Sequence, residues 1–227
     1  MEAIELAKYN VSSDWMIFVF LFTFFLIAWI INVYPKRFNR LLFSVFNNNR
    51  FFQIIREELV FSHRASIVLT IIFIVQAGLF LTISSIIFDF NVFKENTEIL
   101  VQYGYWCLII ISIYILKWIL SGIFLSLIQR QDILKIYLFL TSTFNKTIGL
   151  VLIPITISAI YLPLNYASFF IKLGGAIWLI FLIYRLFKAL SISFLLKVPR
   201  LYIILYLCAF EILPFIVGMK MVIFLSV

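Results

Sequence analysis

The sequence predicts an all-α membrane protein: a bundle of about six transmembrane helices with amphipathic helices at one membrane surface. Of the 227 residues, 65% are hydrophobic and only 12% are charged, and the mean hydropathy is +1.15. Soluble proteins are about 45–50% apolar and about 25% charged. The apolar residues also gather in runs of about 20, the length at which a helix crosses a hydrocarbon core of about 30 Å. We therefore predict a single integral membrane domain over residues 1–227.

Most of these runs have clear boundaries. The first is flanked by Trp15 and Tyr34, aromatic residues of the kind that anchor helices at both membrane surfaces. The third, residues 99–128, is longer than one crossing requires, at about 45 Å as a straight helix, and it contains Lys117. The predicted spans are residues 15–34, 65–88, 99–128, 147–162, 171–190 and 201–226.

The fourth span has the least certain limits in the sequence. Residues 133–145 are apolar but lie between Lys135 and Lys146, which favours a second interfacial helix or an extension of the next span. An alternative register places the crossing at residues 133–154 and buries Lys146. In the first register the crossing is short, and Pro154 is predicted to kink it because proline removes a helix hydrogen bond.

The segment 36–64 has a different pattern. Apolar residues recur at helical spacing on one face, and basic and polar residues, Ser44 among them, recur on another. We favour a helical hairpin lying on the lipid surface with its basic side toward the head groups; a docking platform for a partner protein is the alternative. The candidate contacts to head groups or to a partner are Lys36, Arg37, Arg40, Arg50, Arg56 and Arg64.

Charge counting predicts the orientation. The chain carries a net charge of +8, and thirteen of its 18 Lys and Arg residues fall in segments 36–64, 129–146 and 185–200, all on one side of the predicted membrane. The positive-inside rule makes that side cytoplasmic and places both termini in the periplasm of a bacterial inner membrane. Because the basic residues flank apolar spans, lipid explains them and nucleic acid is not an expected partner.

The sequence lacks the usual motifs of catalysis and metal binding. Its two cysteines, Cys107 and Cys208, lie in separate apolar runs, and there is one histidine, His63. We find no zinc-ligand spacing, nucleophile elbow, phosphate-binding loop or dinucleotide fingerprint. The expectation is no metal, no cofactor and no enzymatic activity.

One intramembrane carboxylate dominates the candidate functional residues. Counted from the flanking basic residues, Glu211, Lys117 and Gln76 all fall roughly 16–20 Å into the membrane. We predict that Glu211 pairs with Lys117, with Gln76 and either Thr23 or Thr156 nearby. The pair is either a static contact between helices or a proton relay, since intramembrane ionisable residues are functional candidates by default.

Pro214 follows Glu211 by three residues and is a second candidate kink. Membrane helices tolerate such prolines when neighbouring groups satisfy the backbone. We therefore favour an ordinary helix bend over a cavity beside the carboxylate.

The last apolar run contains Tyr206-Leu207-Cys208-Ala209-Phe210-Glu211-Ile212-Leu213-Pro214. This Tyr-Leu-Cys-x-x-Glu-x-x-Pro pattern resembles a signature of an uncharacterised family of multi-pass inner-membrane proteins from Bacteroidota. The basic segment 36–64 and the segment from Gly149 to Pro154 are similar to the same family. The resemblance implies an inner-membrane protein with periplasmic termini, and implies no activity. The secretion and gliding machinery of those bacteria is a conceivable setting by association.

Three functions follow as expectations. The first is a non-catalytic inner-membrane protein that acts as a subunit or assembly partner of a cell-envelope complex, with the bilayer and other membrane subunits as its partners. The second is a small proton-coupled transporter or channel that uses the Glu211–Lys117 pair. The chain shows no internal repeat of the kind found in many transporters, which weighs against it. An enzyme of lipid-linked intermediates ranks third.

Overall fold

The computed structural model describes residues 13–35, 38–39, 44–45, 63–88, 98–127 and 131–195. These residues form α-helices and contain no strand. The principal helices are α2 (Ser13–Val33), α5 (His63–Ile87), α6 (Ile99–Leu127), α7 (Gln131–Tyr161) and α8 (Leu164–Leu195). All five are long and apolar enough to cross a membrane, which confirms the predicted all-helical class and agrees with a membrane protein.

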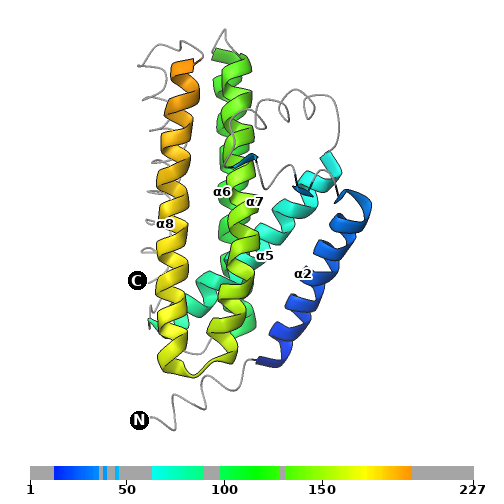
Figure 1. Cartoon of the computed structure of the whole chain (residues 1–227), viewed down its shortest axis with the longest axis vertical. Coiled ribbons are helices and arrows are strands. Elements are labelled where there is room, and N and C mark those ends of the chain that lie inside the picture. The colour runs from blue at the N-terminus through cyan, green and yellow to red at the C-terminus, as the bar shows by residue number, and fades with distance from the viewer. Residues whose placement is uncertain are drawn as a thin grey trace.

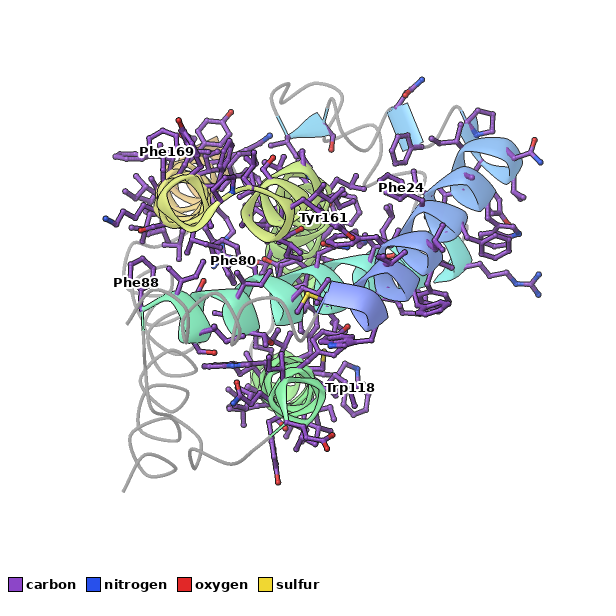
Figure 2. All side chains as sticks on the ribbon, turned by 90° about the horizontal axis from the view of Figure 1, so that it is seen from below. Phe24, Phe80, Phe88, Trp118, Tyr161 and Phe169 are labelled. Carbon is purple, nitrogen blue, oxygen red and sulfur yellow. The ribbon has the colours of Figure 1, made fainter. Side chains whose placement is uncertain are left out.

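The five helices alternate in direction along the bundle (Figure 1). Helices α2, α6 and α8 end, and α5 and α7 begin, at one end of the bundle, which we call the basic end because Arg64, Lys146 and Lys188 lie toward it. Helix α5 runs obliquely through the middle. Seen along the bundle, α7 and α8 lie on one side of α5 and α6 lies on the other (Figure 2).

Helices α5 and α7 form the core because small residues let them approach closely. A Cβ atom added to Gly149 would lie 2.7 Å from the Cα atom of Phe73, so α7 packs directly on the backbone of α5. A Cβ atom added to Gly174 of α8 would lie 2.6 Å from the ring of Phe80. Small residues at such crossings are typical of helix association in membranes.

The outer helices keep most of their apolar surface outside the bundle. Within the candidate spans, 56% of the α5 residues and 61% of the α7 residues are buried, against 22% for α2, 11% for α6 and 17% for α8. Aromatic side chains stand on these outer faces, with Phe24 on α2, Trp118 on α6 and Phe169 on α8 (Figure 2). Such a surface is stable where lipid or another apolar surface covers it.

Helix α7 differs from the sequence prediction. Residues 133–145 are not a separate interfacial helix but continue into the next span, which was the other alternative, because one helix runs from Gln131 to Tyr161. Its membrane-compatible part begins at Leu138 rather than at residue 147. Pro154 lies inside this helix, and the kink there stays a prediction. The predicted boundary relied on Lys146 as an anchor outside the membrane, but this side chain is only 2% exposed within the bundle.

The predicted turn before α8 is likewise shorter than expected. The predicted spans end at residue 162 and begin again at residue 171, whereas α8 begins at Leu164, directly after Pro163. Proline is favoured at the start of a helix because its missing N–H is not needed there. The backbone N–H groups of Tyr166 and Ala167 donate to the Pro163 carbonyl oxygen and close the first turn.

Two predicted elements lie largely outside the described residues. The sixth span, residues 201–226, is one of them, so the count of six stays a prediction. Of the predicted surface hairpin, residues 36–64, the structure describes short pieces, including Ser44 and Val45. Both residues are fully buried, and Val45 packs with Leu140 and Phe144. The prediction that Ser44 faces the head groups is therefore wrong, because this part of the segment packs against α7 and α8.

Candidate functional site

Gln76 sits in the core of the bundle and joins three helices. Its Nε2 atom donates to Thr23 Oγ1 on α2 at 3.0 Å, and its Oε1 atom accepts from Thr156 Oγ1 on α7 at 3.1 Å. All three side chains are at most 1% exposed. We call Gln76, Thr23 and Thr156 the amide node.

The threonines of the amide node also bond to their own helices. Thr23 Oγ1 donates to the Val19 carbonyl oxygen at 2.6 Å, and Thr156 Oγ1 lies 3.0 Å from the Leu152 carbonyl oxygen. A threonine hydroxyl can therefore keep a partner without Gln76. The amide node is neutral. Hydrogen bonds of an amide to hydroxyl groups on two other helices are typical of contacts that determine which helices pack together.

A second group of polar side chains gathers near the basic end, and four of its described members are basic. Lys146 of α7 donates from Nζ to Ser66 Oγ of α5 at 2.6 Å. Ser66 lies two residues inside the candidate span that begins at Arg64. We call Lys117, Lys146, Arg185 and Lys188 the cationic layer.

A hydrogen-bonded series links α6, α7 and α8 within the cationic layer. Arg185 Nη1 donates to Asn145 Oδ1 at 3.4 Å, and Asn145 Nδ2 donates to the Tyr114 hydroxyl at 2.8 Å. Lys117 follows Tyr114 by one helical turn, and its charge lies within electrostatic range of Arg185. Two like charges in a medium of low dielectric repel each other, and the charge of Arg185 acts on Lys117 in this sense.

Lys188 connects α8 to the segment after α2. Its Nζ atom donates to the carbonyl oxygens of Ser44 and Val45, both at 2.7 Å, and lies 5.9 Å from the centre of the Phe144 ring. The Tyr184 hydroxyl also donates to the Val45 carbonyl oxygen, at 3.3 Å. Hydrogen bonds to a charged donor are stronger than neutral ones. They hold this part of the chain over the basic end.

The amide node and the cationic layer lie at different heights in the bundle. Gly78 of α5 lies against Tyr103 and Cys107 of α6, and the ring of Phe73 lies 6.0 Å from that of Tyr114. The height of Gln76 therefore falls between residues 107 and 114 of α6, and Lys117 lies beyond them. At about 1.5 Å per residue, Lys117 lies about 5–15 Å closer to the basic end.

The structure separates two residues that the sequence placed together. Gln76 bonds to both threonines that we expected near it, whereas Lys117 lies nearer the basic end, within electrostatic range of Arg185. Glu211 lies outside the described residues, so its pairing with Lys117 stays a prediction. Pro214 lies outside them as well.

The structure describes one of the six basic residues that we predicted to contact head groups or a partner. Arg64 is exposed at the start of α5, in keeping with a place at the membrane surface. The other five candidates fall outside the described residues: Lys36, Arg37, Arg40, Arg50 and Arg56.

The sequence analysis did not identify four of the polar residues near the basic end as candidate site residues. It treated Lys146, Arg185 and Lys188 as anchors at the membrane surface and did not single out Asn145. One available signal was the spacing of Arg185 and Lys188, which places both on one face of a long apolar helix. The part of the chain that the structure describes contains no group of three His, Cys, Asp or Glu side chains that could hold a metal ion.

Comparison with known families gives one match. The profile of a family described as "Domain of unknown function (DUF4271)" matches residues 16–222. No curated protein and no solved structure matches the chain.

Proposed function

The chain belongs to the DUF4271 family, and we propose that it is a non-catalytic subunit or assembly partner of a cell-envelope complex. The proposal includes a place in the inner membrane of a Bacteroidota cell with both termini in the periplasm. The predicted signature in the last span and the excess of basic residues on one side support that location.

The observation that carries the proposal is the contrast between the inner and outer helices. Helix α6 packs mainly on α5, and only 11% of the residues in its candidate span are buried. Its outer face carries large side chains, including Leu108, Ile115 and Trp118. A helix held on one side offers its other side to a helix of a partner subunit, and such interfaces need van der Waals fit rather than catalytic groups.

The polar residues of the core support the same proposal. The amide node is closed among three helices, and each of its hydrogen bonds joins neighbouring segments. In this arrangement polar groups specify how the helices assemble, as expected of a scaffold.

Purification of the tagged full-length protein in mild detergent tests this function. We expect a membrane protein to copurify in a fixed ratio, and we expect Ile115→Ala with Leu108→Ala to reduce its recovery while leaving the thermal unfolding temperature nearly unchanged. The matched control is Leu179→Ala with Ile183→Ala on the exposed face of α8. A protein that remains an isolated monomer under all mild conditions contradicts the proposal.

A small proton-coupled transporter or channel is the second candidate. The observation in its favour is Lys117, a basic residue inside a candidate span and within electrostatic range of Arg185. If the purified protein moves protons across liposome membranes and loses this activity with Glu211→Gln, the transporter replaces the subunit as the proposed function.

A further inference from the structure

We propose that a water molecule binds between α6 and α7, held by Thr141, Tyr114 and Lys117. The water accepts hydrogen bonds from the Tyr114 hydroxyl and the Lys117 ammonium, and it donates one to Thr141 Oγ1. The site hydrates a charged side chain within the apolar part of the bundle. The proposal is independent of the proposed function, because a subunit, a transporter or an enzyme can each contain such a water.

The first observation is the hydroxyl group of Thr141. Thr141 is 7% exposed, and within the described part of the chain its Oγ1 atom has no hydrogen-bond partner. Buried polar groups are nearly always hydrogen-bonded, to ordered water where no protein group serves. The other described threonines each donate to the carbonyl oxygen four residues earlier: Thr23, Thr70, Thr82, Thr143, Thr147 and Thr156. The Thr141 hydroxyl differs from all of them, so a buried water is its expected partner.

The second observation places Thr141 and Lys117 at one level. Asn145 Nδ2 donates to the Tyr114 hydroxyl at 2.8 Å, which fixes the register between α7 and α6. The two helices run in opposite directions (Figure 1). One turn toward the basic end therefore leads from Asn145 to Thr141 on α7 and from Tyr114 to Lys117 on α6. At about 1.5 Å per residue the two steps are about 6 and 4.5 Å long, so both end at nearly the same height.

The hydrogen-bonding groups at this level match one water molecule. The Tyr114 hydroxyl accepts from Asn145 and keeps its own proton to donate. An ammonium has three N–H donors, so one bond from Lys117 to water leaves two for any other partner. The Thr141 hydroxyl can accept the bond that the water donates. A water held in this way makes about three hydrogen bonds, which is typical of buried waters.

The third observation is the position of Lys117 along α6. It lies inside the candidate span Ile99–Leu120, and residues 118–127, about 15 Å of helix, follow it before α6 ends. Charged side chains inside a membrane are stabilised by polar partners or by water that enters beside them. The charge of Arg185 repels that of Lys117. A water beside the ammonium weakens this repulsion, because it raises the local dielectric.

Radiolytic labelling of the full-length protein in a mild detergent tests the site. A short X-ray pulse splits bound water into hydroxyl radicals, which oxidise the side chains beside that water. We expect Tyr114 to be labelled in the wild-type protein, and Thr141→Val to reduce its labelling rate by about threefold because the water loses one of its bonds. The matched control is Thr143→Val, since Thr143 is a buried threonine whose hydroxyl already bonds to the Phe139 carbonyl oxygen. It should leave the labelling rate of Tyr114 unchanged.

Rapid mixing into water enriched in heavy oxygen, just before the pulse, distinguishes bound water from bulk water. A held water exchanges slowly, so heavy oxygen should appear on Tyr114 later than on Tyr166, which is 61% exposed. This measurement needs no variant and therefore decides the question if Thr141→Val fails to fold. Simultaneous appearance on both tyrosines overturns the proposal, and so does an equal labelling rate of Tyr114 in Thr141→Val and the wild-type protein.

Thermal unfolding gives two further outcomes. If the Thr141 hydroxyl bonds to water, Thr141→Val should lower the unfolding temperature. If it has no partner, the substitution removes an unsatisfied hydroxyl and raises the unfolding temperature, which overturns the proposal. If sodium chloride stabilises the wild-type protein more than sodium gluconate does, and Thr141→Val removes the difference, the ligand is an anion and the assignment to water is wrong.

Discussion

The amide node and the cationic layer are both buried polar clusters that join three or more segments of the chain, and they differ in charge. The amide node is neutral, and its hydrogen bonds close among Gln76, Thr23 and Thr156. The cationic layer is charged: Arg185 bonds to Asn145 of α7, and Lys188 bonds to the carbonyl oxygens of Ser44 and Val45. Hydrogen bonds from a charged donor are stronger than neutral ones, so their loss is expected to cost more. The comparison separates a neutral contact between helices from charged contacts that also hold the segment after α2.

The largest loss of stability is expected from a substitution that disrupts both the amide node and the cationic layer. Gly149→Val would place side-chain atoms against the backbone of Phe73, forcing α7 away from α5. Because α7 carries both Thr156 and Lys146, we expect a loss of about 3 kcal/mol in the free energy of unfolding, or failure to fold. Unfolding in a denaturing detergent measures this loss of free energy. The control, Gly104→Ala, has open space around the added methyl group and should change little.

The second-largest loss of stability is expected from a substitution in the cationic layer alone. Lys188→Met leaves the carbonyl oxygens of Ser44 and Val45 without this donor, so we expect a loss of about 1.5–3 kcal/mol. The rate of amide hydrogen exchange should rise around residue 45, because that segment loses its hydrogen bonds to α8. Lys172→Met is the exposed counterpart on the same helix and should alter neither stability nor exchange. Unchanged exchange at residue 45 would show that Lys188 does not hold the segment.

A smaller effect is expected at the amide node. Gln76→Leu removes two hydrogen bonds but leaves Thr23 and Thr156 able to bond to their own helices. Single interhelical hydrogen bonds in membrane proteins contribute about 0.6 kcal/mol on average, so we expect a loss of about 1–2 kcal/mol. A double-mutant cycle with Thr23→Val measures the coupling directly. Additive losses from Gln76→Leu and Thr23→Val would mean that the hydrogen bond between them contributes nothing.

The smallest effect on stability is expected at Lys117. This side chain is partly exposed, and the charge of Arg185 repels its own. Lys117→Gln should therefore change the free energy of unfolding by no more than about 0.5 kcal/mol, as is usual for a surface position. A loss above about 2 kcal/mol would show that Lys117 is part of the structural framework instead.

The sequence predicted much of the helical framework because hydropathy and helix length determine it. It identified α2, α5 and α6 to within about two residues at each end. It failed at α7 because Lys146 has the sequence character of a membrane-surface anchor. Its burial depends on Ser66, 80 residues away in the chain, which no local pattern contains.

The candidate site was predictable only in part, for the same reason. Counting residues along each span placed Gln76 and its two threonines near mid-membrane, where the structure joins them. The same count put Lys117 at that height, but α5 runs obliquely past α6 and shifts the register between them (Figure 2). The contact of Lys188 with Ser44 and Val45 depends on how the chain returns over the bundle, and helical periodicity carries no information about that.

The most direct test of the contrast between the two clusters measures the free energy of unfolding of Gln76→Leu and Lys188→Met, together with hydrogen exchange around residue 45. We predict that Gln76→Leu lowers the free energy of unfolding by about 1–2 kcal/mol and leaves exchange around residue 45 unchanged. Lys188→Met should lower it by about 1.5–3 kcal/mol and raise the exchange rate there. If both variants raise the exchange rate around residue 45 equally, the contrast drawn between the two clusters is wrong.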